Sequence, residues 1–84
     1  MNFNQLINGP LQIYPNPTGN TINIVGSAFE LEEIVVFNSI GQNVTTRTTI
    51  TNANKGKIVL DLSQLNTGMY FVKTKTTTNK VYKQ

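Results

Sequence analysis

Short apolar runs separated by turn-forming residues occupy most of this 84-residue chain. Ile22 and Ile24 alternate with polar residues, as do Ile58, Leu60 and Leu62, and this is the period of a strand with one buried face. No stretch keeps the period of a helix. The pattern therefore predicts short strands at Leu11–Tyr14, Thr21–Val25, Ile34–Asn38, Asn43–Thr49, Lys57–Leu62, Met69 to Lys73 or Lys75, and Lys80–Lys83.

Residues with turn chemistry separate these segments. Because proline fixes φ, the segment Pro15-Asn16-Pro17-Thr18-Gly19 predicts a stiff corner between the first two strands. Gly41 and Gln42 belong to a predicted tight reversal, and Asp61 is expected to accept backbone N–H bonds from the loop that follows it. Further loops or turns are predicted at residues 51–56, 63–68 and 77–79.

About seven short strands with turns between them are typical of an Ig-like antiparallel β-sandwich. The apolar run Ile34–Phe37 predicts a strand that is buried on both faces, or nearly so. Alternation places Tyr70 and Val72 on one face of their strand and Phe71 and Lys73 on the other. The predicted core comprises Ile13, Ile22, Ile24, Ile34, Val36, Val44, Ile58, Leu60, Leu62, Leu65, Tyr70, Val72 and Val81.

The chain length allows one small domain. We assign it to residues 11–84 and interpret residues 1–10 as a linker remnant or N-terminal arm. No segment has the roughly 20 apolar residues that span a bilayer, and the first residues do not have the pattern of a signal peptide. If the protein is exported, we therefore expect either that its export signal lies elsewhere or that this chain is a fragment of a larger protein.

The residue types present argue against catalysis. The chain contains no His and no Cys, so Ser-His-Asp and Cys-His arrangements, disulfides and thiolate metal sites are excluded. Glu30, Glu32 and Glu33 offer carboxylates for a calcium ion, but the Asp-x-Asp pattern of a calcium loop is absent. No cofactor is expected.

Charge is unevenly distributed along the chain, whose net charge is +3. Residues 1–54 carry three Glu and one Arg, a balance of −2, whereas residues 55–84 carry six Lys and one Asp, a balance of +5. These lysines either solvate strand edges or meet an anionic surface. Basic residues near Tyr70, Phe71 and Tyr82 offer only a faint nucleic-acid pattern, so neither a nucleic acid nor a small-molecule substrate is expected.

Three motifs follow one another in a fixed order. They are Tyr14-Pro-Asn-Pro-Thr-Gly19 with Ile22-Asn-Ile24, then Ile34-Val-Val-Phe-Asn-Ser-Ile-Gly-Gln-Asn-Val44, and finally Leu60-Asp-Leu-Ser-Gln-Leu-Asn-Thr-Gly-Met-Tyr-Phe-Val-Lys73 with the ending Lys80-Val-Tyr-Lys-Gln84. Together they resemble the type A C-terminal sorting domain of the type IX (Por) secretion system of Bacteroidetes, from about Leu11 to Gln84. Phe37 stands where this family more often has Tyr, and Met69 where it has Ile or Val; both changes preserve apolar volume.

The resemblance implies a function in transport. Such a domain is a non-catalytic signal that directs a covalently linked N-terminal cargo domain from the periplasm across the outer membrane to the cell surface. The implied partners are an outer-membrane translocon, a shuttle protein and a surface sortase, which removes the signal. By the same resemblance, the machinery reads Gly68, Tyr70, Lys80, Val81, Lys83 and Gln84. The residues of the structural motifs are Pro15, Asn16, Pro17, Gly19, Gly41, Gln42 and Asp61.

Two other functions are compatible with a small sandwich, because a fold does not determine a function. The chain could be an Ig-like adhesion or carbohydrate-binding module, although it lacks Trp and has only 3 Tyr for a sugar platform. It could also be a spacer between a cargo and the membrane.

Overall fold

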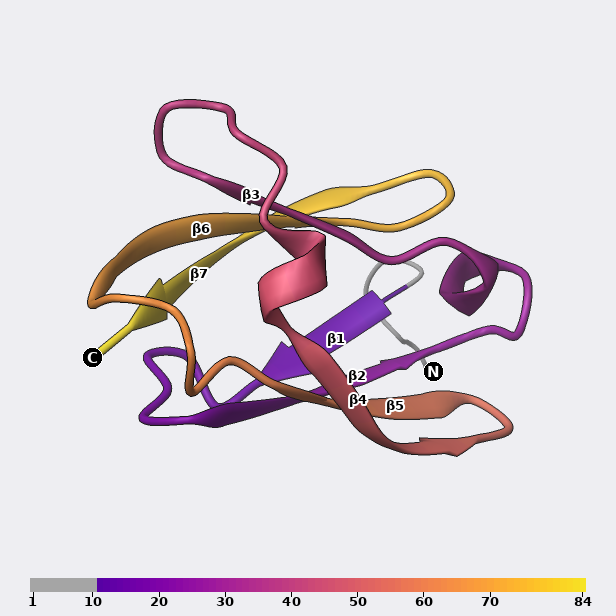
Figure 1. Ribbon diagram of the computed structural model, residues 1–84. Helices are drawn as coiled ribbons and strands as arrows, with labels where there is room; N and C mark the ends of the chain where they lie inside the picture. Colours follow the sequence, from indigo (N-terminus) through magenta and orange to yellow (C-terminus); the bar gives the residue numbers. More distant parts are fainter. Residues whose placement is uncertain (1–10) are drawn as a thin grey trace, which may run out of the picture.

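The computed structural model describes residues 11–84, which form two antiparallel β-sheets packed face to face (Figure 1). The prediction that residues 1–10 are a linker lies outside the described residues. The elements are β1 (Leu11–Tyr14), β2 (Thr21–Gly26), β3 (Val35–Asn38), β4 (Thr49–Asn54), β5 (Lys57–Asp61), β6 (Gly68–Lys73) and β7 (Thr78–Lys83), with 3₁₀ turns η1 (Glu30–Glu32) and η2 (Thr45–Arg47).

The order of the strands identifies the type of sandwich. One sheet has four strands in the order β1-β2-β5-β4, and the other has three in the order β3-β6-β7. If β1 to β7 are lettered A to G, the sheets have the orders A-B-E-D and C-F-G. This is the arrangement of an immunoglobulin constant-type domain. The predicted Ig-like antiparallel β-sandwich is confirmed. The described residues contain no helix that is long and apolar enough to cross a membrane.

The core lies between the two sheets and consists of the inward-facing alternate residues of the strands, together with Val44, Leu62 and Leu65 from the connections. Eleven of the predicted core residues are buried: Ile22, Ile24, Val36, Val44, Ile58, Leu60, Leu62, Leu65, Tyr70, Val72 and Val81. Ile13 and Ile34 are only partly buried and pack against this cluster, because β1 is an edge strand and Ile34 precedes the first paired residue of β3.

The prediction of a strand at Asn43–Thr49 followed by a loop at residues 51–56 is wrong. The bridge between Phe37 and Asn43 is isolated, and the chain then turns through η2 toward the other sheet, where β4 pairs with β5 (Figure 1). All six residues of β4 are exposed, so no apolar alternation marks it as a strand. The turn is limited to Lys55 and Gly56, whose φ of 86° suits glycine.

Two further predictions need correction. β3 is buried on one face only: Val36 is fully buried, whereas Val35 and Phe37 are half-buried on the outer face of the sheet. The last strand begins at Thr78 rather than Lys80, because the turn that precedes it is closed by a bond from the Thr74 N–H to the Thr77 carbonyl. The other strand predictions match to within one residue at each end.

Candidate functional site

The C-terminal strand β7 brings together the motifs that lie farthest apart in the sequence. It forms one edge of the three-stranded sheet and pairs with β6, with Val81 opposite Tyr70 and Lys80 opposite Phe71. Its backbone groups on the other side would be unpaired if no other segment reached them. That segment is the Pro-Asn-Pro corner, residues 15–19.

Asn16 covers the edge of β7 with its side chain. Its Nδ2 donates a hydrogen bond to the Lys80 carbonyl at 2.9 Å, and its Oδ1 accepts one from the Tyr82 N–H at 3.0 Å. One carboxamide thus takes both bonds that a residue of a neighbouring strand would take. The two prolines on either side of Asn16 have cis peptide bonds.

Thr18 continues the same contact with its backbone. Its N–H donates to the Tyr82 carbonyl at 2.9 Å, and its carbonyl accepts from the Gln84 N–H at 2.8 Å. The Thr18 hydroxyl, which is buried, donates to the Thr21 carbonyl at 2.5 Å. The corner therefore seals β7 from Lys80 to Gln84 and is itself tied to the start of β2.

The residues proposed for recognition divide into two groups. Lys80 and Gln84 are exposed. Val81 and Tyr70 are in the core, and the Tyr70 hydroxyl donates to the Asn66 carbonyl at 2.7 Å, as in the tyrosine corner of Ig domains. Lys83 is only 8% exposed, and its Nζ donates to the Gln84 carbonyl at 3.2 Å.

Gly68 is half-buried and starts β6, where it pairs with Lys83. The structure therefore places all six proposed residues on β7, on the strand beside it, or at the chain end that follows.

The other predicted motif residues stabilise turns away from β7. Gly41 has a φ of 86° and its N–H donates to the Asn38 carbonyl at 3.0 Å, which confirms the tight reversal. The Gln42 side chain accepts a bond from Asn38 Nδ2 at 2.8 Å. Asp61 accepts the Ser63 N–H at 2.8 Å, as predicted, and hydrogen bonds from Ser63 lower the pKa of the Asp61 carboxyl.

Glu30 secures the turn before β7, a contact that no local sequence pattern indicates. Its carboxylate is buried and accepts hydrogen bonds from the Thr74 hydroxyl at 2.7 Å, the Thr76 N–H at 3.1 Å and the Thr76 hydroxyl. The bonds from Thr76 and Thr74 lower the pKa of Glu30 and outweigh desolvation, which acts in the opposite direction. The β2–β3 connection is thus bound to the turn between β6 and β7.

The neighbouring carboxylates are also engaged. Glu33 binds Lys73 Nζ at 2.7 Å, and Glu32 binds Lys75 Nζ at 3.3 Å. The hydrogen bond and charge of Lys73 lower the pKa of Glu33. Within residues 11–84, no three acidic, His or Cys side chains are grouped so that they could hold a metal ion.

The fold and these contacts define a class: a small Ig-like sandwich whose first sequence motif closes the edge of its last strand. A family model described as "Secretion system C-terminal sorting domain" matches residues 12–84, and the chain belongs to this family. No curated protein and no solved structure was found to match the chain.

The family confirms the resemblance inferred from the three motifs. The domain is a type IX secretion C-terminal sorting signal, a class known from Bacteroidetes, that marks a cargo for export to the surface or the medium. It therefore interacts with the type IX machinery as a cargo signal, and its family points to a non-catalytic role.

Proposed function

We propose that this domain is a removable sorting signal that carries a covalently linked N-terminal cargo through the outer-membrane translocon. A shuttle protein then delivers it to a surface sortase. The sortase cleaves upstream of the folded domain, within or before residues 1–10, and joins the cargo to an anionic lipopolysaccharide. The family match over residues 12–84 carries this proposal. Cleavage upstream of β1 is also favoured because the strand is paired with β2 from Leu11 onward, which protects its backbone.

Within the signal, the six proposed recognition residues act in different ways. Lys80 and Gln84 are exposed and available for contact with the machinery. Tyr70 and Val81 are buried, so they contribute by fixing β7 in place. Gly68 and Lys83 are paired where β6 begins and β7 ends, and they set the position of Gln84.

The test is a fusion of residues 1–84 behind a periplasm-directed fluorescent reporter in a bacterium with a working type IX system. We expect extracellular reporter in this strain and none in a strain that lacks the translocon. Deletion of Lys80–Gln84 should abolish export. Lys80→Ala should reduce it, whereas Lys55→Ala, a matched change of an exposed lysine in the β4–β5 turn, should not.

Removal by the sortase is tested separately, by the mass of the exported reporter. The reporter should lack residues 11–84 in the complete strain and retain them in a strain without the sortase. Mature surface protein that still carries residues 11–84 in the complete strain would contradict cleavage. If the reporter remains in the periplasm of all strains, the interpretation as an adhesion or carbohydrate-binding module takes the place of this proposal.

A further inference from the structure

The outer faces of the two sheets differ in character. Strand alternation and register place eight side chains on the outer face of the three-stranded sheet: Val35, Phe37, Met69, Phe71, Lys73, Thr78, Lys80 and Tyr82. Five of these eight are apolar or aromatic. We call these five, Val35, Phe37, Met69, Phe71 and Tyr82, the aromatic face.

The outer face of the four-stranded sheet is mostly polar. Thr, Asn, Gln, Lys and Asp side chains occupy most of its outward positions, and only Tyr14, Val25 and Val59 interrupt them. Both outer faces face the same solvent, so an apolar outer face is not a general requirement of this sandwich. Polar side chains are compatible with the outer face of the four-stranded sheet, and they would be equally compatible with the outer face of the three-stranded sheet.

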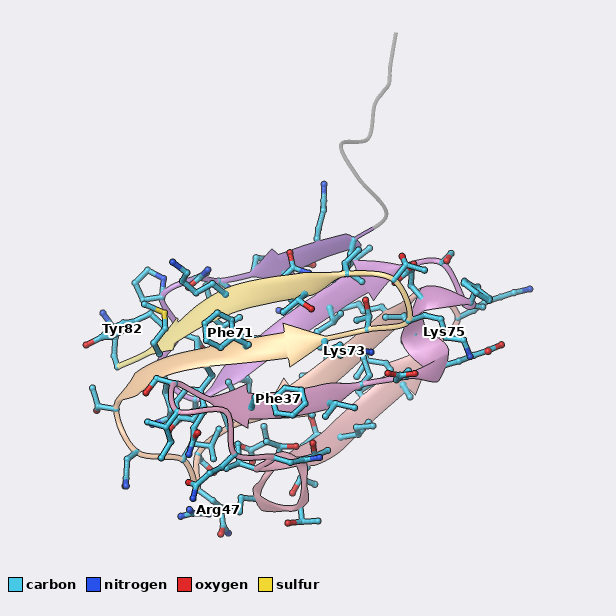
Figure 2. All side chains as sticks on the ribbon, turned by 90° about the horizontal axis from the view of Figure 1, so that it is seen from above. Phe37, Arg47, Phe71, Lys73, Lys75 and Tyr82 are labelled. Atoms are coloured by element: carbon cyan, nitrogen blue, oxygen red, sulfur yellow. The ribbon has the colours of Figure 1, made fainter. Side chains whose placement is uncertain are left out.

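The aromatic face is not needed to complete the core. Phe37 and Phe71 are direct cross-strand neighbours, and Figure 2 shows both rings on the side of the sheet that faces away from β1, β2, β4 and β5. Phe37 and Phe71 are half-buried, and Tyr82 is 39% exposed. Phe, Tyr and Met are the residue types enriched at the centres of protein interfaces, and contiguous apolar surface on a small domain marks a contact site.

Charge at the border of the aromatic face restricts the partner further. Lys80 lies opposite Phe71 in the register of β7 and β6, and it forms no salt bridge among residues 11–84. Lys73 lies on the same face but is already paired with Glu33. A complementary surface would therefore present apolar side chains to the two phenylalanines and a carboxylate to Lys80.

We propose that the aromatic face is the surface by which the sorting signal docks onto a protein of the secretion machinery, through apolar side chains bordered by a carboxylate. This inference rests on the proposed function and names the recognising face. A protein is favoured over an anionic lipid because one unpaired lysine beside five apolar side chains gives little attraction to a charged membrane, where each basic residue adds only about 1 kcal/mol.

The first experiment uses the reporter fusion in the secreting strain. The double substitution Phe37→Thr and Phe71→Thr keeps residues with high β-propensity while it removes the rings. Extracellular reporter should fall about tenfold or more, the loss typical of interface anchors. The matched control, Val25→Thr with Val59→Thr on the outer face of the other sheet, should be exported like the unmodified fusion. Thermal unfolding of each purified variant shows whether it is folded.

A second measurement leaves both phenylalanine-to-threonine substitutions out and so avoids their effect on the stability of the domain. A photoreactive amino acid is placed at position 71 in one fusion and at position 59 in another. In secreting cells, position 71 should form a crosslink with a protein of the machinery and position 59 should not, and the crosslink should be absent in the strain without the translocon. Equal crosslinking at both positions, or none at position 71 while export proceeds, overturns the inference.

The outcomes separate this inference from the proposed function. If the unmodified fusion is not exported, the proposed function fails. If it is exported and the phenylalanine variant is exported equally well, only the docking face is wrong. Cosedimentation with phosphatidylglycerol vesicles is the remaining arm: binding that is lost in the phenylalanine variant, together with normal export, would assign the face to lipid and overturn the inference.

Discussion

Two of the four edge strands, β4 and β7, expose their edges to very different extents. All six residues of β4 are solvent-exposed, its register with β5 is interrupted by a bulge between Ile50 and Asn52, and no further strand covers it. β7 is sealed by Asn16 and Thr18. A polar, irregular edge resists pairing with other chains by itself, whereas β7 borders the aromatic face and needs dedicated residues to close it.

The largest expected effect comes from the inner side of β7. Val81 is fully buried opposite Tyr70, so Val81→Asp would place a carboxylate in the core at a cost of about 3 kcal/mol or more. We expect the domain to be unfolded at 25 °C, with no dispersed amide signals by NMR. Ala53→Asp on β4 is the control and should remain folded, because Ala53 is exposed. A folded Val81→Asp variant would contradict the importance assigned to the buried side chain at position 81.

Removal of the Asn16 carboxamide is expected to have the next largest effect. Asn16→Ala loses both bonds to β7 and should lower the free energy of unfolding by about 1–2 kcal/mol, measured by urea denaturation. Amide hydrogen exchange of Tyr82 should accelerate. The matched substitution Asn52→Ala on β4 should change stability by less than about 0.5 kcal/mol. An equal loss of unfolding free energy in Asn16→Ala and Asn52→Ala would mean that the side chain at the edge of β7 is no more important than one on β4.

Asn16→Asp sharpens the same test. The aspartate can accept the Tyr82 N–H but cannot donate to the Lys80 carbonyl, which would face a negative charge. Its stability should therefore be lower than that of the unmodified domain above the aspartate pKa and should recover as acid protonates the carboxyl. A stability at neutral pH equal to that of the unmodified domain would mean that the bond to Lys80 contributes nothing.

A smaller effect is expected from one buried hydroxyl. Thr18→Val preserves the side-chain shape but removes the donor to the Thr21 carbonyl, at a cost of about 1 kcal/mol. Thr51→Val on β4 removes a weaker contact, the 3.4 Å bond to the Val59 carbonyl, and should be close to neutral. Thermal unfolding of the two variants measures the difference, and a larger loss for Thr51→Val would reverse the ranking of the edges.

The smallest expected effect is a change in pH dependence at the turn before β7. Because hydrogen bonds lower the pKa of folded Glu30, its contribution to stability is complete above its ordinary pKa of 4.5 and is lost as the pH falls through the folded value. Glu30→Gln should thus be less stable than the unmodified domain at neutral pH, and the gap should narrow in acid. Urea titrations between pH 7 and pH 3 measure this gap, and a constant gap would contradict the role assigned to the carboxylate.

Most of the fold could be predicted because the buried strands carry a strong alternating signal. The inward residues of β2, β5 and β6 are apolar at every second position, and turn residues mark their ends. β4 was missed because an exposed edge strand has no buried face, and its Thr and Asn residues resemble those of a loop. The half-buried outer face of β3 was missed because a short apolar run does not reveal whether one side or both sides are covered.

The site could be predicted only in part. The motifs at Pro15–Gly19 and Lys80–Gln84 were identified separately, but no local pattern indicates that Asn16 reaches residues 64 and 66 positions away. From the sequence, Glu30 is indicated only as one of three nearby carboxylates, with Glu32 and Glu33, that a calcium ion could use. The burial of Glu30 depends on the Thr74 and Thr76 donors from a distant turn. Long-range partners of polar side chains are set by topology, which the local sequence does not encode.

The Asn16 contact has a consequence for how the domain is made. Synthesis proceeds from the N-terminus, so the corner emerges early and must wait for almost the entire domain before its partners on β7 appear. A chain that stops a few residues short, through premature termination or proteolysis, has no Tyr82 N–H for Asn16 to bind. Closure of the sandwich at Asn16 therefore requires that translation has passed the last strand.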